Sequence, residues 1–514
     1  MNKKFIIEIL LLLILGGLTS LSLPPLNLFF VNFFTFSIFF IFLFKKLNDQ
    51  KSGFFFFLYG WLFGLSYFLS NLYWITISLT FDPNFKFLIP VALILIPSFL
   101  GLFYGLATFI FCKFGLKKLL SSFFLFSLLF GLVEFLRGNI LTGFPWNLFI
   151  YSLSENLSFI SFASIIGTYA LNLLIISFFS APAIYILRKS KVESFIFILI
   201  LLIPILFLIY GKSYKQSFLN EEIVKNPYLI RIIGSKISLD RFYIDNQAEN
   251  IINELINLSS PEPYKKTFFL WPEGIIPNTY LDELKLYESL FIKNFNENHL
   301  IGLGISSRSL INENYKYFNS FSLIDNKLNL VQNYNKINLV PFGEFLPFEN
   351  LLNKIGLKTI TNNIGSFTKG GERKIIHIKN NFQEFKFLPL ICYEIIYSGN
   401  LTKDNDYDYI INISEDGWFG KSVGPKQHFS HSIFRAIETG KYVLRSANNG
   451  MTAIINPLGE IEKKIDYNKD GFIDFEKRRD LNPTIFSLYG NKIFILLILL
   501  YILLIFSFNK IKDE

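Results

Sequence analysis

The sequence is poor in cysteine and histidine, with two and four of these residues among 514. One cysteine, Cys112, lies in a strongly apolar region, so the polar segment 212–490 holds only Cys392 and cannot form a disulfide within itself. His428 and His431 are spaced as if on one helical face, but no third ligand follows at a metal-binding spacing. We therefore expect no metal site.

Several nucleotide-binding and hydrolase signatures are also absent from the sequence. It has no GxxxxGK[ST] phosphate loop, no GxSxG elbow, no internal repeat and no low-complexity tail. The formal net charge is +9, yet no pattern of basic and aromatic residues indicates nucleic acid binding. We expect neither a nucleic acid partner nor a bound cofactor.

Long apolar runs are abundant. Hydrophobic residues make up 51% of the chain and the mean hydropathy is +0.40, which is too apolar for an ordinary soluble enzyme. A membrane-spanning helix needs roughly 20 mostly apolar residues. About eight such runs are present, at 5–23, 27–44, 54–80, 87–111, 120–151, 158–187, 193–210 and 491–508. We interpret the first run as a span rather than a cleaved signal, because Pro24 and Pro25 lead straight into the next span without a convincing cleavage site.

The basic residues predict the orientation of these spans, because cytoplasmic loops retain Lys and Arg. With the N-terminus in the cytoplasm, the short loops on the opposite side hold only Lys86 and Arg137. Segment 212–490 then lies outside the cytoplasm. Near the end of the fifth run, Glu134 and Arg137 are three residues apart and are expected to neutralise each other. The basic residues expected on the cytoplasmic side are Lys3, Lys4, Lys45, Lys46, Lys51, Lys113, Lys117, Lys118, Arg188, Lys189, Lys191, Lys510 and Lys512.

The predicted domains are a seven-span membrane domain at 1–211, an extramembrane domain at 227–482 and an eighth span at 491–508. Helical spacing of apolar residues in the extramembrane domain predicts helices at 245–258, 281–295 and 426–441. Short apolar runs alternate with these helices, which indicates a layered α/β domain. The runs predict strands at 228–234, 267–273, 300–306, 385–393 and 407–414.

Three candidate catalytic residues lie where apolar or polar strands end. Glu273 ends FFLWPE, Lys336 follows the polar run QNYN, and Cys392 ends FLPLIC. A thiol is a weak nucleophile until a base accepts its proton, and a nearby carboxylate can act as that base. A lysine ammonium can stabilise the thiolate and the oxyanion that develops on an attacked carbonyl. The combination predicts acyl transfer through a thioester on Cys392.

The ordered motifs resemble the apolipoprotein N-acyltransferase family, whose catalytic part is a nitrilase-like αββα sandwich. They are WPEG, YNKINLVPFGEFLPF, LICYEIIY, DGWFGKSVGPKQHFS and RSANNGM, and EFLRGNILTGFPWN (134–147) resembles the signature of that family's fifth span. The resemblance implies that Glu273 is the general base, Lys336 the oxyanion stabiliser and Cys392 the nucleophile. It also implies supporting roles for Glu344, Tyr393, Glu394 and Trp418.

One stretch departs from the family pattern. The family usually reads Ser-Asn-Asp-Ala-Trp-Phe-Gly where this chain has SEDGWFG (414–420), so Glu415 replaces an amide and Gly417 an alanine. The triad is complete, but the effect of these two departures on the local loop contacts is not predicted by the sequence.

The resemblance implies that a fatty acyl chain passes from a phospholipid to the α-amino group of a diacylglyceryl-cysteine apolipoprotein, without a cofactor. It also implies a multi-pass protein of the bacterial inner membrane with a periplasmic catalytic domain. Two alternatives stay open: a membrane-tethered amidase that passes the thioester to water, and a transporter with a degenerate enzymatic domain. The sequence does not indicate acyl-chain or head-group preference, the lipoproteins served or the oligomeric state.

Overall fold

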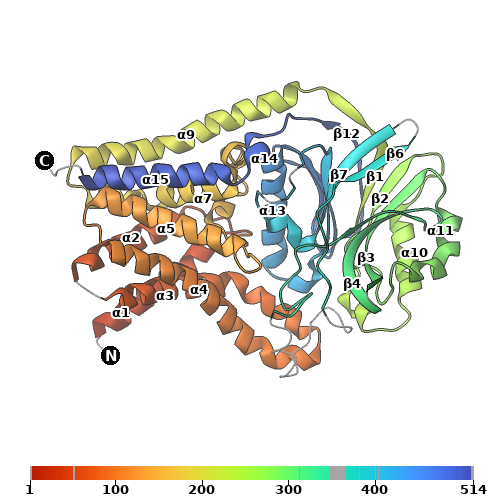
Figure 1. The fold of residues 1–514 in the computed structure, drawn as a ribbon, viewed down its shortest axis with the longest axis horizontal. Coiled ribbons are helices and arrows are strands. Elements are labelled where there is room, and N and C mark those ends of the chain that lie inside the picture. Colours follow the sequence, from red (N-terminus) through yellow and green to blue (C-terminus); the bar gives the residue numbers. More distant parts are fainter. Residues whose placement is uncertain are drawn as a thin grey trace.

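A helical bundle and a β-sandwich lie end to end in the computed structural model of the chain (Figure 1). Both chain termini are at the end of the bundle that is remote from the sandwich (Figure 1). The structure describes residues 3–49, 52–311, 313–347, 366–380, 383–399, 401–402 and 404–510.

The bundle is built from long helices joined by short 3₁₀ segments. Its α-helices are α1 (Lys3–Ser20), α2 (Val31–Lys46), α3 (Gly53–Leu72), α4 (Ile89–Phe114), α5 (Leu119–Asn139), α6 (Leu157–Ile160), α7 (Ala163–Ser180), α8 (Pro182–Leu187), α9 (Lys191–Asn220) and α15 (Lys492–Lys510). The 3₁₀ segments are η1 (Leu47–Asp49), η2 (Tyr73–Thr80), η3 (Pro83–Leu88) and η4 (Phe149–Leu153).

Seven helices in the described part of the chain are long and apolar enough to cross a membrane. They coincide with the second to eighth predicted spans. The first predicted span, 5–23, is largely helical as α1, but α1 does not meet the criterion of length and composition. It carries Glu8, which is buried and accepts a hydrogen bond from Lys46 at 2.8 Å. The predicted number of spans thus exceeds the number found by one.

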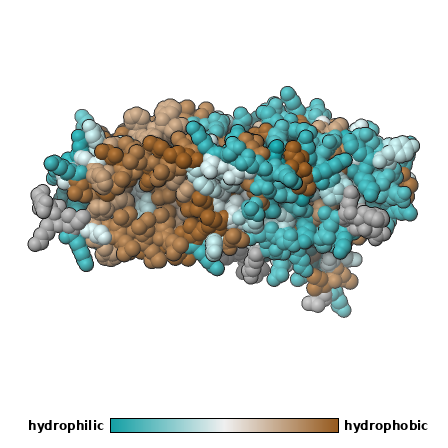
Figure 2. All heavy atoms as spheres, turned by 90° about the horizontal axis from the view of Figure 1, so that it is seen from above, coloured by the Kyte–Doolittle hydropathy of each residue, from teal (hydrophilic) through white to brown (hydrophobic). Residues whose placement is uncertain are grey.

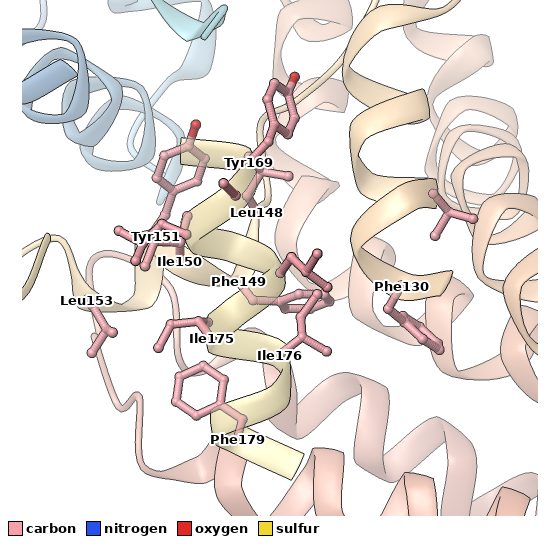
Figure 3. Packing of buried hydrophobic residues seen from close by; sticks show 14 of the residues in the cluster. Phe130, Leu148, Phe149, Ile150, Tyr151, Leu153, Tyr169, Ile175, Ile176 and Phe179 are labelled. Carbon is pink, nitrogen blue, oxygen red and sulfur yellow. The ribbon is translucent and has the colours of Figure 1, made fainter. Parts of the chain in front are cut away.

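The fifth predicted span, 120–151, is too long. Helix α5 ends at Asn139, and the apolar residues that follow turn back into the protein instead of continuing the helix. Figure 3 shows Phe149 and Ile150 beside α7, where Ile176 also lies. Hydropathy identifies apolar residues but does not distinguish a lipid-facing helix from a buried turn, which explains the error.

The hydropathy of the surface differs between the helical bundle and the sandwich. Hydrophobic side chains gather over the helical half, and hydrophilic ones cover most of the sandwich (Figure 2). Exposed apolar residues such as Leu206, Leu496 and Leu503 lie on α9 and α15. An apolar surface of this kind is stable in lipid and not in water.

The sandwich consists of two six-stranded sheets that face each other across an apolar core. One has the order β12-β1-β2-β3-β4-β5, from β1 (Ile223–Gly234), β2 (Thr267–Leu270), β3 (His299–Ile311), β4 (Asn314–Asp325), β5 (Leu330–Asn335) and β12 (Gly471–Arg479). The other has the order β11-β10-β9-β8-β7-β6, from β6 (Ile376–Asn380), β7 (Gln383–Ile391), β8 (Tyr409–Glu415), β9 (Tyr442–Asn448), β10 (Thr452–Ile455) and β11 (Ile461–Ile465). In each sheet three neighbouring central strands, β1-β2-β3 and β7-β8-β9, are parallel.

Helices cover the outer faces of both sheets, which completes the αββα arrangement. Helices α10 (Ala248–Ser259) and α11 (Glu288–Asn294) pack on the first sheet, while α13 (Gly424–Thr439) lies between the second sheet and the bundle (Figure 1). Short segments are η5 (Leu239–Phe242), η6 (Glu283–Tyr287), η8 (Cys392–Ile396), η9 (Asp416–Phe419) and α14 (Ile485–Tyr489).

The predicted fold class is confirmed, with a polytopic helical part and a nitrilase-like sandwich. The five predicted strands correspond to β1, β2, β3, β7 and β8, and two predicted helices correspond to α10 and α13. The helix predicted at 281–295 is only partly correct, because it is divided into η6 and the short α11.

Buried polar contacts join the sandwich to the bundle. Glu438 of α13 accepts hydrogen bonds from the backbone N–H of Thr168 at 2.7 Å and from the Ser398 hydroxyl at 2.6 Å. The indole N–H of Trp146, in the turn after α5, donates to Gln427 of α13 at 2.9 Å. These contacts hold the bundle against α13, the helix that packs on the second sheet.

Candidate active site

Strand order brings the three predicted catalytic residues together. Glu273 follows β2 and Cys392 follows β7, and these strands belong to facing sheets. Lys336 is the residue after β5, and its backbone N–H donates to the carbonyl of Asn319 on β4 at 2.8 Å. The three residues are therefore presented from the ends of a rigid scaffold, as expected for a catalytic site.

Lys336 lies between two carboxylates. Its Nζ is 3.0 Å from Oε1 of Glu273 and 3.0 Å from Oε1 of Glu344, and its side chain is only 1% exposed. Burial alone lowers the pKa of a lysine, but the negative charges of Glu273 and Glu344 outweigh burial and raise the pKa of Lys336 well above its usual value. Lys336 is therefore a fixed positive charge.

Asn319 is a site residue that the sequence did not reveal. Its Nδ2 donates to Oε1 of Glu273 at 2.8 Å and to Oε1 of Glu344 at 2.7 Å. It lies in β4, in the polar run NYKYFNSFS, where nothing in the residue pattern distinguishes it from its neighbours. Together with Lys336 it separates the two carboxylates and fixes their orientation.

The second oxygens of the Glu273 and Glu344 carboxylates accept hydrogen bonds from different parts of the protein. Oε2 of Glu344 accepts from the backbone N–H of Val340 at 2.8 Å, within its own loop. Oε2 of Glu273 accepts from the backbone N–H of Glu415 at 3.0 Å, across the sandwich. Burial raises the pKa of Glu344, although the Lys336 charge opposes this effect.

Cys392 occupies the first position after β7 in a constrained backbone conformation. Its φ is +47°, in the left-handed region that residues other than glycine rarely adopt. The side chain is buried, and burial raises the pKa of the thiol well above its usual value. The negative charge of Glu273 acts in the same direction and the Lys336 charge in the opposite one. At neutral pH the resting residue is therefore a thiol that needs a base.

His428 contacts the backbone of Cys392. Its Nε2 is 3.3 Å from the carbonyl oxygen of Cys392, and its Nδ1 is 2.9 Å from Oδ1 of Asp416 and 3.1 Å from Nη2 of Arg445. Burial, followed by the Arg445 charge, lowers the pKa of His428. The position of the ring hydrogen determines whether His428 donates to the Cys392 carbonyl through Nε2 or to the Asp416 carboxylate through Nδ1. His431 instead packs against Tyr151.

Glu394 joins the loop that follows Lys336 to the backbone that precedes Cys392. Its carboxylate accepts backbone N–H groups from Ile337 at 2.9 Å, Asn338 at 3.1 Å and Ile391 at 2.9 Å. It also pairs with Arg373 at 2.9 Å. Burial disfavours the charge, but Arg373 and the three N–H groups outweigh it and lower the pKa of Glu394. Glu394 therefore holds the backbone on both sides of the site.

Tyr393 and Trp418 both contact the bundle. The Tyr393 hydroxyl donates to the carbonyl of Gly143, in the turn after α5, at 2.9 Å. The half-buried Trp418 makes an edge contact with Phe81 between η2 and η3, with ring centroids 5.6 Å apart. Glu134 and Arg137 of α5 form the expected buried ion pair, and Arg137 also donates to the carbonyl of Phe144 in the same turn. The loops that carry Tyr393 and Trp418 thus rest directly on the bundle.

The arrangement supplies a thiol, a neighbouring carboxylate and a buried cation for stabilising an oxyanion. Glu273 and Lys336 both affect the charge state of Cys392, which places all three within one electrostatic environment. These are the groups needed for covalent acyl transfer.

Both parts of the chain match families of known proteins. Residues 15–181 match the family model of the apolipoprotein N-acyltransferase N-terminal domain, and residues 269–479 match that of carbon-nitrogen hydrolases. Among solved structures, the carbon-nitrogen hydrolase from Helicobacter pylori G27 aligns with 50% of this chain and 89% of its own, with 12% identity and a TM-score of 0.35.

Two relatives extend over nearly the whole sequence. The apolipoprotein N-acyltransferase of Rhizobium leguminosarum bv. trifolii is 31% identical over 488 residues, which cover 90% of this chain and 89% of the relative. That of Rickettsia prowazekii is 32% identical over 510 residues, which cover 98% of each chain. The chain therefore belongs to the apolipoprotein N-acyltransferase family and is an acyltransferase.

Proposed function

We propose that this acyltransferase moves a fatty acyl chain from a phospholipid to the N-terminal α-amino group of a diacylglyceryl-cysteine apolipoprotein, through a thioester on Cys392. The observation that carries the proposal is the buried group formed by Glu273, Lys336 and Glu344 beside the Cys392 thiol. The family membership of the chain supports the choice of donor and acceptor.

In the first half-reaction, Sγ of Cys392 attacks the ester carbonyl of the phospholipid while Glu273 accepts the thiol proton. The ammonium of Lys336 stabilises the resulting oxyanion. The carbon–oxygen bond to the glycerol then breaks, Glu273 returns its proton to the leaving alkoxide, and lysophospholipid departs. The acyl chain stays on Cys392 as a thioester.

In the second half-reaction, the α-amine of the apolipoprotein attacks the thioester carbonyl. Glu273 accepts a proton from the amine, and Lys336 again stabilises the oxyanion. The carbon–sulfur bond breaks and the thiolate of Cys392 regains the proton. The product is an amide at the lipoprotein N-terminus, and the enzyme returns to its initial state.

The position of the site against the bundle supports lipid substrates. Tyr393, adjacent to the nucleophile, bonds to the turn after α5, and Trp418 contacts the segment between η2 and η3. Both substrates are confined to a bilayer, so an active site at the end of a membrane bundle can reach them without extracting them into water.

We also propose an inner-membrane location with the catalytic domain in the periplasm, and the division of the chain at 1–211, 227–482 and 491–508. The asymmetry of lysine and arginine supports this orientation. Alkaline phosphatase fused after Tyr264, which is 98% exposed in the sandwich, should be active. A fusion after Gly115, between α4 and α5, should be inactive. The reverse pair of results would overturn the orientation.

The function is tested with purified enzyme, phospholipid and a synthetic diacylated lipopeptide that has a free α-amine. The expected products are N-acylated peptide and lysophospholipid in equal amounts, with the ping-pong kinetics of two separate half-reactions. Free fatty acid without acylated peptide would favour an amidase-like hydrolase. A lipopeptide whose α-amine is already acetylated is the matched control and should yield no product.

A further inference from the structure

The two departures from the family pattern, Glu415 and Gly417, lie beside the catalytic carboxylate. We propose that Arg241 and Glu415 form a buried ion pair that positions Glu273, and that Gly417 leaves the space this pair needs. The proposal rests on the proposed function, in which Glu273 is the base, and assigns positioning residues to that base.

Arg241 and Glu415 are paired deep in the sandwich. Nη2 of Arg241 lies 2.6 Å from Oε2 of Glu415, and each side chain is 3% exposed. The same oxygen accepts a hydrogen bond from Nδ2 of Asn448 at 2.7 Å. Removing one partner of such a pair leaves a buried charge without compensation, which is strongly unfavourable.

The pair is connected to Glu273 from two sides. The backbone N–H of Glu415 donates to Oε2 of Glu273 at 3.0 Å. Nη2 of Arg241 donates to the carbonyl of Gly274, the residue after Glu273, at 3.1 Å. Arg241 therefore links two backbone segments. One is the turn that carries Glu273 and Gly274, and the other is the end of β8, where the N–H of Glu415 donates to Glu273.

This connection crosses the sandwich. Glu273 and Gly274 follow β2 of one sheet, whereas Glu415 ends β8 of the facing sheet. The backbone at Glu273 also lies close to β3, where a Cβ on Gly304 would come within 2.4 Å of the Glu273 Cα. The base is thus fixed by β3 on one side and by the Arg241–Glu415 pair on the other.

Gly417 is required by the conformation of Glu415. Oε1 of Glu415 turns back and accepts the backbone N–H of Gly417 at 2.8 Å. A Cβ at position 417 would lie 2.7 Å from that oxygen and 3.0 Å from Nδ2 of Asn449. Contacts this short force the carboxylate to move. The glutamate at 415 and the glycine at 417 are therefore a matched pair.

The charges around Glu273 give the pair a measurable signature. Lys336, Glu344 and Cys392 surround the carboxylate on the reacting side, and Arg241 and Glu415 lie behind it. Replacing Glu415 leaves the Arg241 cation uncompensated, which favours the Cys392 thiolate. Replacing Arg241 leaves an additional carboxylate, which disfavours the thiolate.

The test compares Glu415→Gln, Arg241→Gln and the double variant in a Cys112→Ser background, so that Cys392 is the only thiol. The readout is the alkylation rate of Cys392 by iodoacetamide as a function of pH. Relative to the parent, the acidic limb should move to lower pH in Glu415→Gln and to higher pH in Arg241→Gln. The double variant should return near the parental position. The proposal would be overturned if the acidic limb moved in the same direction in both single variants, or if it did not move in either.

A matched control separates positioning from a general loss of stability. Arg231 is also a buried arginine, paired with Asp474 at 2.8 Å in the β1–β12 region. Arg231→Gln should leave the acidic limb unchanged. In the acyl transfer assay, Glu415→Gln should lower kcat by roughly 10- to 100-fold, the cost expected when a reacting group is misplaced, with KM little changed. A change confined to KM would contradict a positioning role.

Gly417→Ala provides the second variant. Alone it should lower kcat by about tenfold, whereas in a Glu415→Asn background, where the shorter side chain no longer reaches position 417, it should cost little further activity. Full activity of Gly417→Ala alone would overturn the role of Gly417. Failure of the wild-type enzyme to form an acyl-enzyme would contradict only the proposed function. The alkylation experiment needs no lipid, so it tests the Arg241–Glu415 pair in that case as well.

Discussion

Nζ of Lys336 lies 3.0 Å from Oε1 of Glu273, and the same ammonium is equally close to Glu344. Two carboxylates therefore share one buried cation beside a neutral thiol. Transfer of the Cys392 proton to Glu273 leaves the total charge of this group unchanged. Because the charges only redistribute within the site, a buried thiol can react without the cost of creating a new buried charge.

The distinction between a point charge and a planar cation can be tested at Lys336. Lys336→Arg should reduce acyl-enzyme formation at least about 100-fold, because a guanidinium does not fit a site shaped for one ammonium between two carboxylates. Lys336→Met should have the same effect by removing the charge. Single-turnover acylation measures the rate, and the melting temperature identifies unfolded variants. Near-normal turnover of folded Lys336→Arg would refute the assigned role.

The two glutamates should not be equivalent. Glu273→Gln removes the proposed base and should lower the acylation rate by roughly 10²- to 10⁴-fold. Glu344→Gln should have a smaller effect, because the Glu344 carboxylate orients Lys336 and is bonded within its own loop. The two rates are compared under identical conditions. If Glu344→Gln were the more damaging change, the two roles would have to be exchanged.

Glu394 predicts a pH dependence of stability. Because its pKa is lowered in the folded protein, the ionised carboxylate contributes stability above its unfolded value of about 4.3, and this contribution is lost as pH falls through the lower folded value. Glu394→Gln should destabilise the protein by about 3 kcal/mol at pH 7. The deficit should shrink as pH falls below about 4. Melting temperatures of both proteins across pH test this, and a deficit independent of pH would contradict it.

His428 should matter through the backbone of Cys392. His428→Asn removes the ring that contacts the Cys392 carbonyl and should lower the acylation rate about tenfold by loosening the constrained nucleophile. His431→Asn is the matched control from the same helix, since His431 packs against Tyr151 and does not contact Cys392. Equal effects of the two substitutions on acylation would argue against this role.

Each predicted strand contains a run of buried apolar residues. In β2 and β8 every residue is buried, and such runs are visible as uninterrupted apolar segments. Strands β5 and β11 are mostly exposed, so their polar sequences LVQNYN and IEKKI gave no strand signal. Burial did not guarantee prediction, because the interior strands β9 and β10 are fully buried and were also not predicted.

The sequence predicted those candidate site residues that follow a visible apolar or polar run. Glu273 and Cys392 lie at the ends of recognisable strands, Lys336 follows a polar run, and the resemblance added Glu344 and Glu394. Asn319 and Arg241 were not found, because their partners are distant in sequence: Asn319 contacts Glu273 and Arg241 contacts Glu415. Contacts of this kind depend on how the sheets face each other, which no local pattern specifies.

The central claim is that Cys392 carries the acyl chain, and intact-mass analysis of purified enzyme incubated with phospholipid alone tests it most directly. We expect a mass increase of one acyl chain, located on Cys392 and released by neutral hydroxylamine, as for a thioester. The adduct should persist until a lipopeptide amine is added, and Cys392→Ala should form none. Wild-type enzyme that acquires no adduct, or Cys392→Ala that acquires the same one, would contradict the account.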